Sequence, residues 1–158
     1  MVPDSARISE AHLRYLVIET AISVLFNTVA SLLISLIVIN GSATVPLKRI
    51  LFDMMPQNFM VAFITVLIAT VLTRRRRRLG KIERLQGGAT GFPSHAVLRA
   101  AGAGIVVAAI TFPLLAGVLP AIAPAIWSSH AALYFKCVDA ALLALLITPP
   151  ALQMALRD

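Results

Sequence analysis

Residues 13–39 read LRYLVIETAISVLFNTVASLLISLIVI, an unbroken stretch that contains one basic and one acidic side chain. About 20 apolar residues are enough for a helix to cross the hydrocarbon core of a bilayer. In lipid every backbone amide has to be satisfied within its own segment, and this stretch lacks the strict alternation of a barrel strand. It therefore predicts a transmembrane helix, and it is too long for the core of a cleaved signal peptide.

Three further apolar runs of similar length follow, over residues 54–72, 97–119 and 127–150. Hydrophobic residues make up 59% of the chain, compared with roughly 45–50% in an ordinary soluble domain. The sequence therefore predicts an all-α polytopic membrane protein with four transmembrane helices.

Polar and charged residues divide the chain into segments between these runs. We predict two helical hairpins, over residues 13–73 and 97–150, joined by a basic, glycine-containing linker over residues 74–96. Residues 1–12 form an N-terminal segment and residues 151–158 a C-terminal tail. The ends of the two hairpins, IATVLTRRR and LALLITPPA, are weakly alike, so the halves could be parallel repeats related by an axis along the membrane normal.

The net charge of +7 is distributed unevenly between the two predicted sides of the membrane. Of the 14 lysines and arginines, eleven fall in the N-terminal segment, at the start of the first run, in or beside the linker, or in the tail. Only Lys48 and Arg49 fall on the opposite side. Because cytoplasmic loops are enriched in Lys and Arg, we predict that both termini and the linker are cytoplasmic.

Five consecutive arginines form the most conspicuous motif of the chain: Arg74, Arg75, Arg76, Arg77 and Arg78. Beside a transmembrane helix such a run fixes topology and contacts anionic lipid headgroups, at about 1 kcal/mol per residue. The alternative is a docking patch for an acidic partner. Nucleic acid is not predicted as a partner, because no aromatic residues are interleaved with the arginines to stack on bases.

Small and polar residues recur every four positions in the first and third predicted helices. Such ridges allow close approach of helix backbones in lipid, where no hydrophobic force drives association between helices. We predict helix packing for Ser23, Ser31, Ser35, Ala100, Gly104 and Ala108. The alternative is that the hydroxyl groups line a hydrated path.

Several polar residues fall inside the predicted spans, where each ionisable group costs a few kcal/mol unless it finds a partner or water. Counting along the helices predicts one intramembrane polar cluster made of Glu19, Asn27, Thr65, Thr111, Lys136 and Asp139. Lys136 and Asp139 are three residues apart and therefore share one helix face. They could form an ion pair that fixes helix register, or they could serve transport or proton relay.

No combination of residues predicts catalysis, a metal site or a cofactor. The single cysteine, Cys137, has no partner for a disulfide or a zinc site. The glycines of the linker do not form a phosphate-binding loop, because the pattern GxxxxGK[ST] is absent. We therefore expect no enzyme activity and no cofactor.

Four stretches resemble a group of uncharacterised small four-helix bacterial inner-membrane proteins. These stretches are IETAISVLFN at residues 18–27, PQNFM at 56–60, VLTRRRRR at 71–78 and LLITPPALQ at 145–153. The resemblance implies location and topology, and it assigns no activity to any residue.

Two functions are compatible with these features. The first is a non-enzymatic membrane protein that acts through helix contacts, either as an accessory or assembly subunit of a membrane complex or as a homo-oligomer. The alternative is a small transporter or channel that uses Glu19 or the Lys136 and Asp139 pair.

Overall fold

The computed structural model describes residues 10–39, 42–82 and 95–157. This part of the chain contains helices α1 (Glu10–Ile39), α2 (Leu47–Arg78), α3 (Ala96–Ile122) and α4 (Ser129–Arg157), and the short strands β1 (Thr44–Pro46) and β2 (Ile126–Ser128). All four helices are long and apolar enough to cross a membrane. The predicted all-α class and the number of long apolar helices are therefore confirmed, and such helices suggest an integral membrane protein.

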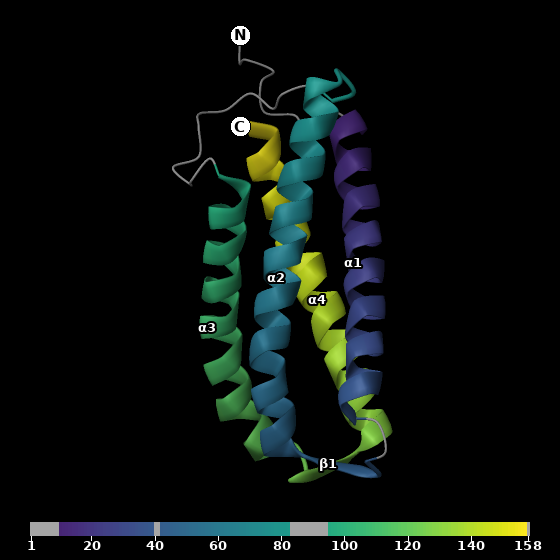
Figure 1. Cartoon of the computed structure of the whole chain (residues 1–158), viewed down its shortest axis with the longest axis vertical. Coiled ribbons are helices and arrows are strands. Elements are labelled where there is room, and N and C mark those ends of the chain that lie inside the picture. The colour runs from purple at the N-terminus through teal and green to yellow at the C-terminus, as the bar shows by residue number, and fades with distance from the viewer. Residues whose placement is uncertain (1–9, 40–41, 83–94, 158) are drawn as a thin grey trace.

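The order in which the helices pack differs from their order in the chain. α2 packs against α3 and α4, and α4 packs against α1, so the helices lie in the order α3, α2, α4, α1 (Figure 1). The consecutive helices α1 and α2 contact each other at only a few points. The two hairpins predicted over residues 13–73 and 97–150 do not pack as separate units, because the close helix contacts form between the two halves of the chain.

The ends of the four helices lie in two groups at opposite ends of the molecule. The start of α1, the end of α2, the start of α3 and the end of α4 lie at one end, which we call the basic end because it carries Arg74–Arg78 (Figure 1). The strands β1 and β2 lie at the opposite end, which we call the strand end.

At the strand end the two inter-helix connections pair as an antiparallel ribbon. Val45 lies opposite Trp127, with Thr44 opposite Ser128 and Pro46 opposite Ile126. Two further backbone bonds extend the ribbon: Leu47 N donates to Ala125 O at 2.9 Å, and Ser129 N donates to Ala43 O at 3.3 Å. The ribbon joins the two halves of the chain at the point where each half turns back into its second helix.

This ribbon marks an internal structural repeat. Leu47 and Ser129 are the first residues of α2 and α4, and 82 positions separate them. The same offset relates Val45 to Trp127, which pair with each other. It also relates buried positions along the two central helices: Ile50 and Ala132, Met54 and Lys136, Asn58 and Ala140, Val61 and Leu143, Ala62 and Ala144, Ala69 and Ala151, Thr70 and Leu152, Thr73 and Ala155.

The helix packing obeys the same relation, since α1 against α4 corresponds to α3 against α2. The halves are therefore arranged as parallel repeats about a pseudo-twofold axis between α2 and α4. The sequence comparison of IATVLTRRR with LALLITPPA has a different register, because it places Ile68 opposite Leu143, an offset of 75 positions.

Several helix ends lie outside the predicted limits. α2 begins at Leu47, seven residues before the predicted run, because Pro46 ends β1 in an extended conformation that suits a helix start. It continues through Arg78, so the first part of the predicted linker 74–96 is helical, and positions 83–94 of that linker lie outside the described residues. The 32 residues of α2 rise about 48 Å, which exceeds the roughly 30 Å hydrocarbon core.

α4 continues through Pro149 and Pro150 to Arg157, so most of the predicted tail 151–158 is helical. The last two turns are held by tertiary contacts, since Leu152 and Leu156 are buried in one apolar cluster with residues of the other three helices. Packing of this kind offsets the backbone hydrogen bonds that prolines remove.

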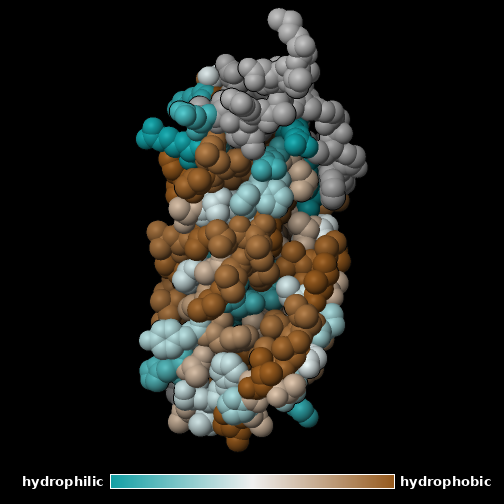
Figure 2. Space-filling model, turned by 180° about the vertical axis from the view of Figure 1, so that it is seen from behind, coloured by the Kyte–Doolittle hydropathy of each residue, from teal (hydrophilic) through white to brown (hydrophobic). Residues whose placement is uncertain are grey.

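Between its two ends the molecule presents an apolar surface. Figure 2 shows a broad band of hydrophobic side chains, with more hydrophilic residues toward both ends and a small hydrophilic patch near mid-height. Large side chains such as Leu25, Ile37, Ile105 and Leu146 are more than half exposed. An apolar exterior of this extent is suited to contact with acyl chains.

Candidate functional site

The separation of α1 from α2 leaves a groove along the molecule, with α4 behind it. Near the strand end the groove holds a cavity of about 260 Å³, which we call the outer pocket. Toward the basic end it holds a cavity of about 140 Å³, which we call the inner pocket. Phe26, Asn27 and Ile64 line both pockets. The two cavities therefore meet at the middle of the helices.

The groove opens sideways toward the surface that faces lipid. The outer pocket is bordered by Phe26, Ile34 and Met60, and the side chains of these residues are 52%, 57% and 47% exposed. Most of its lining is apolar, and its polar lining residues are Asp53, Gln57, Lys136, Asn27 and Ser31. The groove thus combines an apolar rim with a few hydrogen-bonding groups inside.

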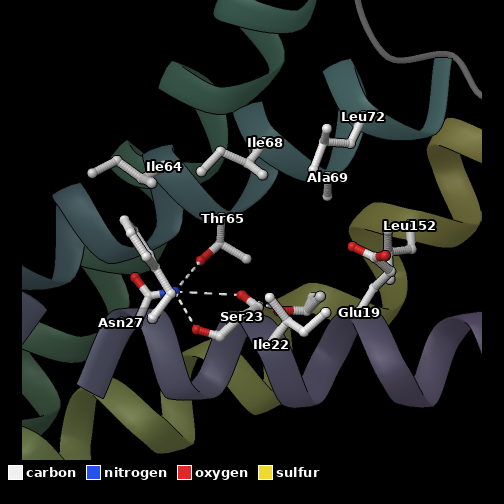
Figure 3. Close-up of a pocket in the computed structure, with 12 residues that line it drawn as sticks. Glu19, Ile22, Ser23, Asn27, Ile64, Thr65, Ile68, Ala69, Leu72 and Leu152 are labelled. Atoms are coloured by element: carbon white, nitrogen blue, oxygen red, sulfur yellow. Dashed lines mark hydrogen bonds between the residues drawn. The ribbon is translucent and has the colours of Figure 1, made fainter. Parts of the chain in front are cut away.

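Asn27 lies where the two pockets meet, and it ties α1 to α2. Its amide nitrogen donates to Thr65 Oγ1 at 3.1 Å and to the carbonyl of Ser23 at 2.8 Å (Figure 3). Ser23 Oγ in turn lies 2.9 Å from Thr148 Oγ1 of α4. The predicted proximity of Asn27 and Thr65 is confirmed, and Thr148 is a member of this group that the sequence did not single out.

Lys136 faces the outer pocket, but its partner is not the predicted one. Its ammonium group lies 3.9 Å from Asp53 Oδ2 of α2, and its side chain is 3% exposed. The carbonyl oxygen of Lys136 accepts from Ser31 Oγ at 3.2 Å and from Gln57 Nε2 at 3.1 Å. Lys136 therefore connects α4 to both helices that border the groove.

Asp139 lies about one turn further along α4 and contacts a different part of α2. Its Oδ2 is 2.7 Å from the side-chain amide of Asn58 on α2, and the opposite end of that amide is 3.1 Å from Thr111 Oγ1 on α3. The predicted pairing of Lys136 with Asp139 is therefore wrong. The two residues share a helix face in sequence spacing, but neighbours on α2 provide each with a closer partner.

Glu19 lines the inner pocket near the basic end (Figure 3), and it forms an ion pair with Arg76. The guanidinium group of Arg76 also lies over the ring of Tyr15, 5.3 Å from its centre. The hydroxyl groups of Tyr15 and Thr73 are 2.9 Å apart. This group joins the first turns of α1 to the end of α2 at the mouth of the inner pocket.

The arginine run is thus divided between two environments. Arg76 pairs with Glu19, and Arg77 Nη1 donates to the carbonyl of Ala155 at 3.4 Å, near the end of α4. Arg75 and Arg78 are exposed. The predicted contact with anionic lipid therefore applies best to the exposed members, because Arg76 and Arg77 are engaged within the protein.

The predicted packing ridges lie at helix contacts. Ser31, Ser35, Ala100, Gly104 and Ala108 are buried, and Ser23 is half-buried. A Cβ atom added at Gly104 would lie 2.8 Å from the ring of Phe59 and 3.1 Å from its carbonyl oxygen. The ridge of α3 therefore packs against α2, and the ridge of α1 packs against α4 through Ser23 and Ser31.

The six residues predicted as one polar cluster are distributed over four groups. Glu19 lies near the basic end, Asn27 and Thr65 in the middle, Lys136 at the outer pocket, and Thr111 with Asp139 between α2, α3 and α4. Sequence reasoning missed Asp53, Gln57 and Asn58. Asp53 was placed outside the span because the predicted run began at residue 54, although all three are polar residues within two turns of one helix.

Among the described residues, no group of three or more His, Cys, Asp or Glu side chains lies close enough together to hold a metal ion. No family model, curated protein or solved structure matches this chain. The groove and its polar groups are therefore interpreted from their own geometry.

Proposed function

We propose that the protein binds an amphiphilic molecule of the bilayer in the groove between α1 and α2 and moves its headgroup between the two leaflets. The observation that carries this proposal is the separation of two consecutive helices by two adjacent pockets, which share Phe26, Asn27 and Ile64 and hold a few polar groups inside an apolar rim. A headgroup could bind these polar groups while its acyl chains stay in the surrounding lipid, and its passage between the pockets requires the Asn27–Thr65 hydrogen bond to open.

The size of the pockets supports a headgroup as the occupant. Cavities of about 260 and 140 Å³ are smaller than the roughly 300–1,000 Å³ of pockets that enclose drug-sized molecules. The rim formed by Phe26, Ile34 and Met60 is open to lipid. Acyl chains therefore need not enter the protein.

The charges in the groove favour a zwitterionic headgroup such as phosphoethanolamine. Lys136 and Asp53 present opposite charges 3.9 Å apart in the outer pocket, and Glu19 and Arg76 present a second pair at the inner pocket. A headgroup with an amine and a phosphate can exchange contacts with either pair. Ionisable residues inside a span are otherwise costly, so their position beside a cavity supports a role in binding.

Orientation in the membrane is part of the proposal. Lysines and arginines of the basic end outnumber those of the strand end, which favours a cytoplasmic basic end and cytoplasmic termini, in a bacterial inner membrane. The inner pocket would then open toward the cytoplasmic leaflet and the outer pocket toward the other leaflet.

A lipid transfer assay tests this function. The protein is reconstituted in phosphatidylcholine vesicles that contain fluorescent NBD-phosphatidylethanolamine, and dithionite reports how fast inner-leaflet probe reaches the outside. We expect faster transfer than in protein-free vesicles, and we expect Ala30→Phe to abolish the increase because Ala30 lines the outer pocket. Val29→Phe is the matched control, since Val29 is exposed to lipid.

Equal transfer rates for Ala30→Phe and the wild-type protein would contradict a role for the groove. An absence of any increase with the wild-type protein would contradict lipid transfer itself.

The accessory-subunit function stays a second proposal, supported by the apolar outer faces of α1 and α3. The ridge containing Gly104 no longer supports it, because that ridge packs inside the chain. Co-purification of another membrane protein from native membranes in mild detergent would support it.

A further inference from the structure

Asp139, Asn58 and Thr111 form a chain of polar groups that connects α4, α2 and α3. Asn58 is buried, with 1% of its surface exposed, and it lies between the other two residues. One end of its amide is 2.7 Å from Asp139 Oδ2 and 3.2 Å from the carbonyl of Met54, and the other end is 3.1 Å from Thr111 Oγ1. These residues do not line the outer or the inner pocket.

An ionised Asp139 satisfies this chain in one amide orientation. The carboxylate can only accept hydrogen bonds, so the Asn58 nitrogen must face it. That nitrogen then donates to Asp139 and to the carbonyl of Met54, while the Asn58 oxygen accepts from the Thr111 hydroxyl.

A neutral Asp139 satisfies the chain in the opposite orientation. The carboxylic acid has a proton to donate, and the amide oxygen of Asn58 can accept it at the same 2.7 Å separation. The Asn58 nitrogen then donates to Thr111 Oγ1, and the Thr111 hydroxyl donates to the carbonyl of Val107 at 2.8 Å. All three side chains keep a hydrogen-bond partner in both states, but in the neutral state Asn58 loses its bond to the Met54 carbonyl, and its amide oxygen then lies 3.2 Å from that carbonyl oxygen.

We propose that Asp139 is a proton-binding site whose occupancy rotates the Asn58 amide and moves the Thr111 hydroxyl from Asn58 to Val107. One proton from the aqueous phase forms the O–H bond of the Asp139 carboxylic acid, and no group leaves. The site changes from a charge of −1 to neutral, and the hydrogen-bond change passes from α4 through α2 to α3.

In the part of the chain that the structure describes, no salt bridge joins Asp139 to a charged group, and Glu19 of the neighbouring helix α1 pairs with Arg76. On α4 the charged neighbour is Lys136, and on α2 it is Asp53, but these two lie 3.9 Å from each other in the outer pocket. Beyond Arg99, α3 carries no acidic or basic residue up to its end at Ile122. A half-buried carboxyl group whose closest contact is a neutral amide can exist in either protonation state at moderate cost.

Infrared spectroscopy of the full chain in lipid vesicles tests the proposal. Acidification should produce the carbonyl band of a protonated carboxylic acid, and labelling of aspartate with ¹³C at the carboxyl carbon should shift that band. Asp139→Asn should remove the band, while Asp53→Asn should keep it. Loss of the band in Asp53→Asn with retention in Asp139→Asn would overturn the assignment, as would the absence of any aspartate band in the labelled wild-type protein.

Asn58→Leu separates a proton site from a merely structural contact. This change removes the donor that stabilises the carboxylate, so the acid band of Asp139 should persist to higher pH than in the wild-type protein. Asn58→Asp should shift it in the same direction, because two neighbouring carboxyl groups resist joint ionisation. An unchanged pH profile in both variants would show that Asn58 does not respond to the proton, and the proposal would fail.

Discussion

Single residues in this protein act mainly through the neighbour that each one meets. Gly104 permits the close contact of α3 with Phe59 on α2, whereas Gly102, two residues earlier, has open space beside it. Glu19 and Lys136 are tolerated inside the molecule because Arg76 and Asp53 lie beside them. The sequence indicates which side chains cost free energy when they are placed in lipid. The size of that cost depends on the neighbouring side chain with which each one pairs.

Gly104→Ala is expected to destabilise the protein by about 1–3 kcal/mol, the usual cost of overpacking a close contact. The added methyl group would lie 2.8 Å from the Phe59 ring and 3.1 Å from its backbone oxygen, so relaxation needs movement of α2 as well as of the ring. Thermal unfolding in mild detergent measures the effect. Gly102→Ala is the matched control and should be neutral, and equal melting temperatures for both variants would argue against the close packing of α3 on α2.

At the scale of the helices, the pairing α1 with α4 and α2 with α3 is the central feature. It places the serine ridge of α1 on α4 and the alanine and glycine ridge of α3 on α2. It also leaves α1 and α2 apart, and that separation produces the groove.

Cysteine crosslinking tests the α1–α4 pairing. In a Cys137→Ser background, Ser23→Cys combined with Thr148→Cys should form a disulfide under mild oxidation, because the native side-chain oxygens are 2.9 Å apart. Leu25→Cys with Thr148→Cys should not crosslink, since Leu25 is 67% exposed on the outer face of α1. A non-reducing gel of a protease-cut protein detects the link, and efficient crosslinking of the Leu25 pair alone would refute the arrangement.

In the whole molecule, the pseudo-twofold repeat places corresponding elements of the two halves at the same end. Both connections at the strand end form β1 and β2, and both helix pairs return to the basic end (Figure 1). The two halves have similar backbones. The arginines nevertheless make the basic end more positively charged than the strand end.

Labelling of single cysteines tests the resulting orientation. In the Cys137→Ser background, Thr44→Cys at the strand end should react with a membrane-impermeant maleimide in intact cells, because Thr44 is exposed and the positive-inside rule places it outside. Arg78→Cys is also exposed and should react only after the membrane is permeabilised. The reverse pattern would invert the proposed topology.

The helices could be predicted from the sequence alone, as could the positions whose side chains are costly to expose to lipid. Apolar runs of sufficient length predict spans because backbone amides in lipid must be satisfied locally, and four such helices are present. It also predicted that Asn27 and Thr65 are close, since depth along a helix follows from counting residues.

The tertiary structure was needed to know which helices pack together and which polar groups contact each other. Depth does not specify the direction in which a side chain points, so Lys136 and Asp139, adjacent on one helix, contact Asp53 and Asn58 instead of each other. Helix ends were also decided by packing, because Leu152 and Leu156 extend α4 beyond its prolines. Long-range packing contacts of this kind are not encoded in local periodicity, and the groove between α1 and α2 depends on them.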